Sequence, residues 1–220
     1  MSGPEADPGA EPLARLHVIT PAGSPETLTA AVEAALAGGA PLVQLRTKEG
    51  SDRARWELAR AVAGRCRAAG ARLVVNDRAD LAAAAGADGV HLGADDLPVP
   101  AARRLLGPVA VIGTTCRDAA GARRAEADGA SYVGVGPVYP TATKSGLPAA
   151  MGPDGVQVVS RAVSIPVIAI GGVDAGRVAE VVAAGAWGVA VCGAVFSAVD
   201  PQAAVEELAE AIGQAAGTRR

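Results

Sequence analysis

The stretch Gly39-Ala40-Pro41-Leu42-Val43-Gln44-Leu45-Arg46 decides the fold that the sequence predicts. It follows the Ala-rich, amphipathic segment Pro25–Ala37 and contains a glycine, an apolar run and then a polar end. Glycine suits the left-handed residue that ends a helix, and a short apolar run suits a parallel strand that is buried on both faces. We therefore interpret the stretch as a helix end, a tight join and a buried strand.

The same join recurs along the chain. Gly-Ala-x-x-Val occurs after a helical segment and before an apolar run at Gly39, Gly70, Gly86, Gly129 and Gly185. The glycine fits the end of a helix, and the small alanine lets the chain turn closely into the next strand. We interpret these joins as structural punctuation, so function is expected at the opposite ends of the strands.

Strand-like runs alternate with helical segments throughout the chain. The expected strands are Leu16–Thr20, Leu42–Arg46, Leu73–Asn76, Gly89–Leu92, Val109–Thr114, Tyr132–Gly136, Val167–Ile170 and Gly188–Cys192. The clearest helical segments are Pro25–Ala37, Asp52–Ala69, Ala119–Ala127 and Gly176–Ala184. This alternation predicts an α/β protein with a single (β/α)8 TIM barrel domain over 13–216. A polar tail over 1–12, rich in Gly, Pro and acidic residues, is expected to be disordered.

Composition limits the classes of function. A net charge of −3 over 220 residues argues against a general nucleic-acid surface. The three cysteines have no paired or metal-type spacing and no signal peptide pattern precedes them, so reduced thiols and a cytoplasmic location are expected. The uncharged stretch 181–199 contains three glycines and divides into helix, turn, strand and loop, so it does not predict a membrane span. The sequence leaves the oligomeric state open, a homo-oligomer included.

A row of polar side chains follows the second expected strand. Because side chains alternate along a strand, Gln44, Arg46 and Lys48 project to the same side. An amide and two cations in one row suit an anionic ligand better than they suit packing. Lys144 adds a third cation from the loop 136–152, which is too long for a simple connection and is typical of a binding loop.

Two carboxylates are candidates for binding a hard cation. Asp77 and Asp96 follow neighbouring strands of the expected barrel, and Mg²⁺ prefers one or two carboxylates together with waters and substrate phosphate. Taken alone, Asp77 could equally be the N-cap of a helix over 78–85. Asp95 and Asp96 could be solvated loop charges. The two residues as a pair favour the metal interpretation.

Glycines after the seventh and eighth strands indicate a phosphate site. Gly171-Gly172 and Gly193 let backbone N–H groups approach an anion, and a short helix beginning near Ala194 would add its dipole. Turn glycines with no ligand are the alternative for each of them. Asp174, just beyond, is expected to cap the next helix.

The two histidines receive no catalytic role from the sequence. His17 and His91 lie inside or at the ends of expected strands. Histidines at such positions are more often hydrogen-bonded and structural than catalytic bases, and we expect that of both.

Taken together, these motifs resemble the thiamine phosphate synthase family. The matching pieces occur in the family's order and span nearly the whole chain beyond residue 15: Gln44-Leu45-Arg46-Thr47-Lys48, Asn76-Asp77, His91-Leu92-Gly93 with Asp96, Gly136-Pro137-Val138-Tyr139-Pro140-Thr141-Ala142-Thr143-Lys144, and Ile170-Gly171-Gly172. The resemblance implies a transferase of thiamine biosynthesis. Such an enzyme joins 4-amino-5-hydroxymethyl-2-methylpyrimidine diphosphate to a thiazole phosphate, giving thiamine monophosphate and diphosphate with the help of Mg²⁺.

The resemblance also implies roles for individual residues. The pyrimidine diphosphate would be held by Gln44, Leu45, Arg46, Thr47, Lys48, Asn76, Thr115 and Lys144. The thiazole phosphate would be held by Thr141, Ala142, Thr143, Gly172, Cys192 and Gly193, and Mg²⁺ by Asp77 and Asp96. Because the thiazole nitrogen needs no general base, catalysis is expected to depend on Arg46, Lys48 and Lys144 stabilising the departing diphosphate.

Three positions depart from the family pattern, and two of them, Ala94 and Gly193, motivate one of two alternatives, a catalytically silent barrel. Ala94 stands where Gln is usual, Thr115 replaces a Ser but keeps the hydroxyl, and Gly193 replaces a Ser and loses it. One alternative is a thiazole tautomerase-like protein, which would use a histidine after the fifth strand, where this chain has Thr115-Cys116-Arg117. The other is this silent barrel, which would only bind thiamine precursors.

Overall fold

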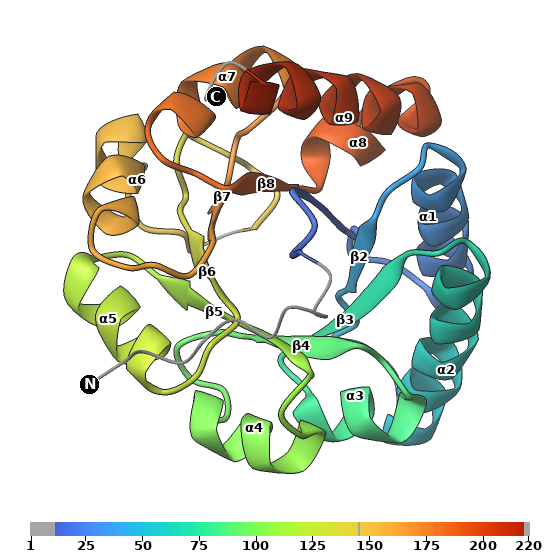
Figure 1. The fold of residues 1–220 in the computed structure, drawn as a ribbon. Helices are drawn as coiled ribbons and strands as arrows, with labels where there is room; N and C mark the ends of the chain where they lie inside the picture. Colours follow the sequence, from blue (N-terminus) through green and yellow to red (C-terminus); the bar gives the residue numbers. More distant parts are fainter. Residues whose placement is uncertain (1–11, 145, 218–220) are drawn as a thin grey trace.

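The computed structural model describes residues 12–144 and 146–217. In this part of the chain eight parallel strands, β1 to β8, close into a barrel in sequence order, and helices surround it (Figure 1). The predicted (β/α)8 barrel is confirmed. All but the last residue of the tail expected over 1–12 lies outside the described residues.

The elements have the following bounds. The strands are β1 Leu16–Ile19, β2 Leu42–Leu45, β3 Arg72–Asn76, β4 Gly89–Leu92, β5 Val111–Cys116, β6 Tyr132–Val135, β7 Val167–Ile170 and β8 Gly188–Val191. The helices are α1 Pro25–Ala37, α2 Asp52–Ala68, α3 Ala79–Ala85, α4 Val99–Leu106, α5 Ala119–Ala127, α6 Gly152–Ser160, α7 Ala175–Ala183, α8 Gly193–Phe196 and α9 Pro201–Gly217. Most of the expected boundaries agree with these to within a residue.

The start of β5 is the clearest error of the sequence prediction. The strand was expected at Val109–Thr114, but it begins at Val111, which pairs with Gly89 of β4. Val109 is instead 89% exposed, in the loop that precedes the strand. Sequence pattern alone cannot separate an exposed apolar loop residue from the first residue of a buried strand. The correction places Thr115 inside the strand rather than after it.

The predicted helix-to-strand joins are confirmed. Each of the five glycines of the Gly-Ala-x-x-Val joins has a positive φ, between 68° and 111°. Asp174 caps α7, as expected, because its side chain accepts a hydrogen bond from the backbone N–H of Arg177. The five glycine joins turn the chain from the end of a helix into the amino-terminal end of the next strand, and the Asp174 cap begins α7.

The apolar core has two layers. The larger one fills the space between the strands and the surrounding helices and includes Val43 and Leu45. The smaller one lies inside the barrel and includes Leu42 of β2 and Tyr132 of β6. Successive residues of a strand point to opposite faces, so every strand except β4 contributes to both layers.

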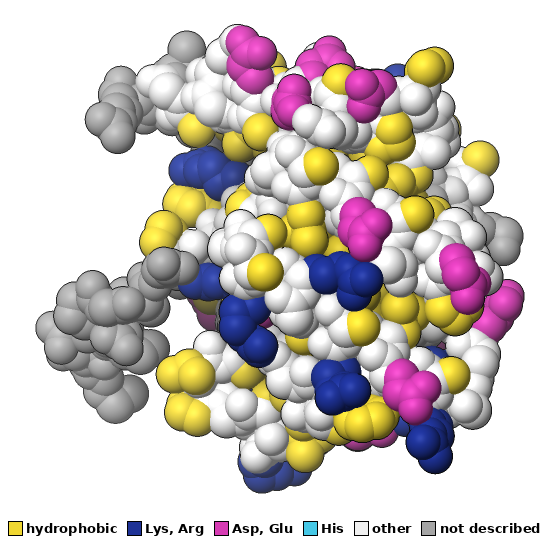
Figure 2. All heavy atoms as spheres, turned by 90° about the vertical axis from the view of Figure 1, so that its right-hand side faces the viewer, with side chains coloured by type: hydrophobic (Ala, Val, Ile, Leu, Met, Phe, Trp, Pro, Cys, Tyr) yellow, Lys and Arg dark blue, Asp and Glu magenta, His cyan; other side chains and the backbone are white. Residues whose placement is uncertain are grey.

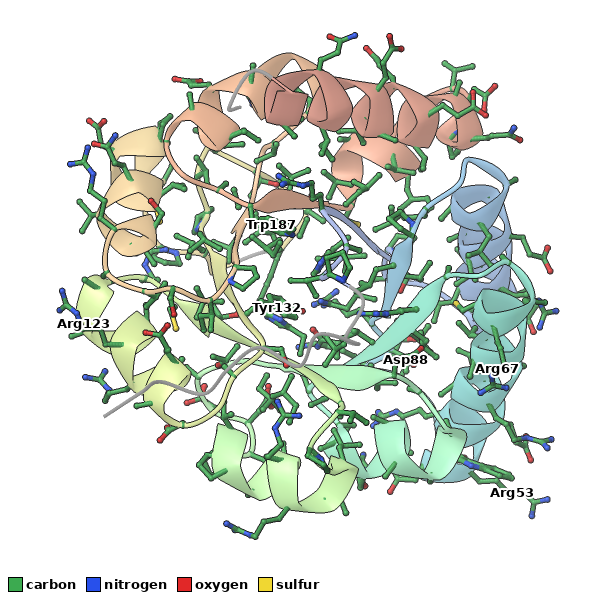
Figure 3. The ribbon with its side chains drawn as sticks, in the orientation of Figure 1. Arg53, Arg67, Asp88, Arg123, Tyr132 and Trp187 are labelled. Atoms are coloured by element: carbon green, nitrogen blue, oxygen red, sulfur yellow. The ribbon has the colours of Figure 1, made fainter. Side chains whose placement is uncertain are left out.

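Tyr132 occupies much of the barrel interior. Its side chain is 1% exposed and lies near the centre of the ring of strands (Figure 3). A Cβ atom added to Gly113 of β5 would lie 2.0 Å from Tyr132 Cζ, so the strand beside the ring must carry glycine there.

Trp187 donates from Nε1 to the Leu13 carbonyl at 2.9 Å, and both residues precede strands at the amino-terminal end of the barrel.

The charged surface has no large region of one sign on the face shown in Figure 2, where acidic and basic side chains are dispersed over the surface. This distribution agrees with the small net charge of −3. Within 12–144 and 146–217, no helix is both long enough and apolar enough to span a membrane.

The contact between Gly113 and Tyr132 generates a stability prediction. Gly113→Ala should lower the free energy of unfolding by about 1–3 kcal/mol or more, because the new methyl group overlaps a ring that has no room to move. Gly213→Ala is the matched control, since a Cβ there meets nothing within 4 Å and lies in α9. Gly213→Ala should raise the free energy of unfolding by about 0.5–1 kcal/mol, because alanine favours the helix more than glycine does. Urea unfolding of both variants provides the measurement, and equal effects would contradict this account of the interior.

Candidate active site

A cavity of about 900 Å³ opens at the carboxyl ends of the strands. Thirteen of the residues predicted for the site line it: Gln44, Arg46, Lys48, Asn76, Asp77, Thr115, Thr141, Ala142, Thr143, Lys144, Gly172, Cys192 and Gly193. These residues come from six strands and their following loops. In (β/α)8 barrels this face carries the active site.

Strand alternation explains which residues of the second strand and its loop reach the cavity. Gln44, Arg46 and Lys48 line it, as the sequence predicted. Leu45 is fully buried in the layer that faces the helices, and the Thr47 hydroxyl donates to the Glu49 carbonyl. Any part that Leu45 or Thr47 plays in binding would have to come from the backbone.

Asp77 has an unusual backbone. Its φ is +67°, and it is the one non-glycine residue with a positive φ among the described residues. This conformation is uncommon outside glycine, and such outliers gather at functional sites. The alternative that Asp77 caps the next helix is wrong, because α3 begins at Ala79 with Arg78 at its N-cap and no side-chain cap.

Asp77 and Asp96 form a carboxyl pair, in which Asp77 lines the cavity and Asp96 is not among the lining residues. Burial and a side-chain hydrogen bond with Asp96 raise the pKa of Asp77, while Lys48 and Arg46 act in the opposite direction. Asp96 also accepts a hydrogen bond from the Gly93 N–H at 2.6 Å. Asp96 is therefore held in place by its loop and is not a freely solvated charge.

The carboxyl pair fits a hard divalent cation. Two carboxyl groups that share a hydrogen bond leave a concentration of negative charge as soon as both ionise, and Mg²⁺ uses one or two carboxylates with waters and phosphate. Across 12–144 and 146–217, no cluster of three or more His, Cys, Asp or Glu residues could hold a metal. An all-protein cage is thus absent from the described residues, whereas the Asp77–Asp96 carboxyl pair is present.

A chain of hydrogen bonds runs beneath the cavity. Burial raises the pKa of Tyr132, and a side-chain hydrogen bond with Gln44 opposes that rise. The Tyr132 hydroxyl lies 3.0 Å from His91 Nδ1, and His91 Nε2 lies 3.0 Å from Thr115 Oγ1, so the imidazole is hydrogen-bonded through both ring nitrogens. The chain thus connects two side chains that line the cavity, Gln44 and Thr115.

Both histidines belong to this buried region and are neutral. Burial lowers the pKa of His91 to about 4 and that of His17 to about 3. The Tyr132 ring stacks on His91 and meets the His17 ring edge-on at a centroid distance of 5.0 Å. The expectation of hydrogen-bonded, structural histidines holds for both, since His17 Nε2 also contacts the Ala14 carbonyl at 3.0 Å.

The long loop after β6 is packed against the Gly171-Gly172 turn. The Tyr139 N–H donates to the Gly171 carbonyl at 2.9 Å. A Cβ atom on Gly172 would lie 2.8 Å from the Tyr139 Cβ, so glycine permits the close approach. Arg177 of α7 lies over the Tyr139 ring at 4.5 Å and donates to the Gly172 carbonyl at 2.5 Å. The loop and the expected phosphate turn therefore form one packed unit.

Thr143 and Gly193 meet across the cavity mouth. A Cβ atom on Gly193 would lie 3.1 Å from Thr143 Oγ1, and Gly193 is the first residue of α8. The predicted thiazole phosphate residues from the β6 loop and from the end of β8 are thus neighbours. A larger residue at 193 would crowd the Thr143 hydroxyl, which gives a physical reason for glycine in place of the family's serine.

Sequence reasoning missed two residues of the site. Tyr132 carries the hydrogen bonds between Gln44 and His91, and no sequence pattern marks its hydroxyl as part of a site. Arg117 lines the cavity and donates to two carbonyls of the β6 loop. Only its position just after a strand, at the functional end of the barrel, could have indicated it.

The fold and the cavity are those of a (β/α)8-barrel enzyme. Comparison with known proteins identifies the family within this class. A family model described as thiamine monophosphate synthase matches residues 16–195. The thiamine-phosphate synthase of Salinispora tropica is 51% identical over 203 residues, which are 91% of this chain and 98% of that protein. The thiamine phosphate pyrophosphorylase structure from Pyrococcus furiosus has 35% identity and a TM-score of 0.81, covering 91% of this chain and 96% of that one.

The chain belongs to the thiamine monophosphate synthase family and is an enzyme of the transferase class. The thiamine biosynthesis bifunctional protein ThiM/ThiE of Symbiobacterium thermophilum is 49% identical over 212 residues, which are 96% of this chain. The chain spans 43% of the length of that relative.

The buried histidines generate a prediction about acid stability. An unfolded histidine binds a proton below pH of about 6.5, whereas folded His17, with a pKa of about 3, does not. The free energy of unfolding should therefore fall as the pH falls from about 6.5 towards 3, by up to about 1.4 kcal/mol per pH unit for this residue. Urea titrations at several pH values should show a shallower fall in His17→Gln than in the native protein. Equal slopes would mean that His17 is charged in the folded state.

Proposed function

We propose that this enzyme makes thiamine monophosphate from 4-amino-5-hydroxymethyl-2-methylpyrimidine diphosphate and a thiazole phosphate, releasing diphosphate. The observation that carries the proposal is that three cations, Arg46, Lys48 and Lys144, line one cavity together with Asp77, whose side chain is hydrogen-bonded to Asp96. The names of relatives with 51% and 49% identity support the same reaction.

The charges of the site suit departure of a diphosphate. Breaking the C–O bond leaves negative charge on the diphosphate and an electron-poor methylene carbon on the pyrimidine. Arg46 and Lys48 at the end of β2, and Lys144 on the β6 loop, would bind the oxygens on which that charge develops. Asp77 and Asp96 would hold Mg²⁺, which when bound would neutralise part of the same charge.

The remaining polar groups would bind and orient the two substrates. Thr115 would offer its hydroxyl to the pyrimidine diphosphate, because it lines the cavity and its Oγ1 is held 3.0 Å from His91 Nε2. Thr141 and Thr143, with the backbone at Gly172 and at Cys192-Gly193, would hold the thiazole phosphate. The thiazole nitrogen attacks with its own lone pair, so the site needs no general base, in agreement with the neutral and fully hydrogen-bonded His91.

A turnover assay tests this function directly. Both substrates incubated with the protein and Mg²⁺ should yield thiamine monophosphate and diphosphate, detected by chromatography. Lys48→Ala and Lys144→Ala should each reduce kcat by about 10²–10³-fold, as removal of one preorganised charge-stabilising group typically does. Arg53→Ala is the matched control, because Arg53 lies on α2 away from the cavity and its side chain is 84% exposed (Figure 3). Binding of both substrates without any product would favour the catalytically silent barrel instead.

The metal site can be tested without turnover. Mg²⁺ should raise the melting temperature of the ligand-free protein, because an ion that binds the folded state stabilises it. Asp77→Asn should abolish that rise. Asp128→Asn, at the exposed C-cap of α5, should keep it. A full Mg²⁺ shift in Asp77→Asn would show that this carboxylate does not ligate the ion.

A further inference from the structure

Arg117 is a polar residue of the cavity to which the proposed reaction gives no role. It follows β5 directly and its guanidinium makes two hydrogen bonds to backbone carbonyls. Nη1 donates to the Gly136 carbonyl at 2.8 Å, and Nη2 donates to the Ala149 carbonyl at 2.9 Å. These carbonyls lie at the two ends of the loop that joins β6 to α6 and carries Thr143 and Lys144.

Among the described residues, two backbone hydrogen bonds also join the ends of the loop, close to the barrel wall. The Met151 N–H donates to the Pro137 carbonyl at 2.9 Å, and the Gly152 N–H donates to the Val138 carbonyl at 3.0 Å. Arg117 reaches Ala149, which lies further into the loop on its returning side. Its two bonds therefore fix the direction in which the loop leaves and re-enters the barrel.

The guanidinium group is suited to this task. Its donors form a rigid planar fork, so one side chain can hold two carbonyls in a fixed relative position. Hydrogen bonds from a charged donor are shorter and stronger than neutral ones. The two distances, 2.8 and 2.9 Å, agree with the range of about 2.7–2.9 Å that is typical of charged donors. Lysine has the same charge but is a compact point donor on a flexible chain, and cannot reproduce the fork.

We propose that Arg117 is a positioning residue that staples the two ends of the β6–α6 loop, so that Thr143 and Lys144 keep one place over the cavity. It would act through the loop, because both terminal nitrogens of its guanidinium already donate to loop carbonyl groups. Its effect on turnover rests on the proposed function, whereas its effect on the loop does not.

Hydrogen exchange tests the staple in the protein without substrates. In Arg117→Gln, amides of the loop between 137 and 150 should exchange about tenfold faster or more, while those of the barrel strands stay unchanged. Arg117→Lys should behave like Arg117→Gln, because charge without the fork does not join the two carbonyls. Arg123→Gln is the control, since Arg123 points away from the barrel on α5 (Figure 3) and should exchange as the native protein does.

Kinetics separate a staple from a direct ligand. Arg117→Gln and Arg117→Lys should each lower kcat/KM by about 10–100-fold, since displacement of a catalytic group by about 1 Å can cost as much. Arg117→Gln combined with Lys144→Ala should be little worse than Lys144→Ala alone, because both changes remove the same interaction. Unchanged loop exchange, near-native turnover in Arg117→Lys, or fully multiplicative losses would overturn the proposal. If the native protein made no product, the proposed function would fail while hydrogen exchange still decided the staple.

Discussion

The alternation of side chains along the strands of a closed parallel barrel is the constraint on which the rest of the structure depends. Every second residue of a strand faces the interior. Along β2 and the residue that follows it, this places Leu42 in the interior core, Gln44 beneath the cavity and Arg46 at its rim. The alternation of side chains thus places apolar residues in the core at one end of the barrel and polar residues at the other end.

Tyr132 links these two regions. Its ring fills the interior so closely that Gly113 can carry no side chain, while its hydroxyl orders the hydrogen bonds from Gln44 to Thr115. A phenol in this place must find polar partners, because an unpaired buried hydroxyl would cost stability. The partners it finds are side chains that line the cavity. Packing and ligand binding therefore share one residue.

The sequence predicted what depends on local pattern. The glycine joins, the alternation of strands and helices and the common direction of Gln44, Arg46 and Lys48 all follow from repeats of residue type, and the structure confirms their placement. The sequence prediction failed where a contact between distant segments of the chain determines the local structure. The start of β5 is set by pairing with Gly89, and the backbone of Asp77 by its surroundings, and neither has a local pattern.

The same limit applies to the residues of the site. Asp96 could not be told from a solvated charge until the Gly93 N–H and the Asp77 carboxyl were found beside it. Arg117 bonds to carbonyls that follow it by 19 and 32 residues, a relationship that no motif expresses. The proposed ligand roles of all these residues remain predictions, because they require a bound diphosphate and metal ion.

The central claim is that the cations and the carboxyl pair surround one leaving group. A crystal structure of the protein with diphosphate and Mg²⁺ tests it most directly. The account predicts one metal ion within about 2.0–2.1 Å of oxygens from Asp77, from Asp96 and from the diphosphate. Arg46 and Lys48 should then contact the remaining diphosphate oxygens. Diphosphate bound at the Gly171-Gly172 turn, with Asp77 and Asp96 still hydrogen-bonded to each other and free of metal, would contradict the account.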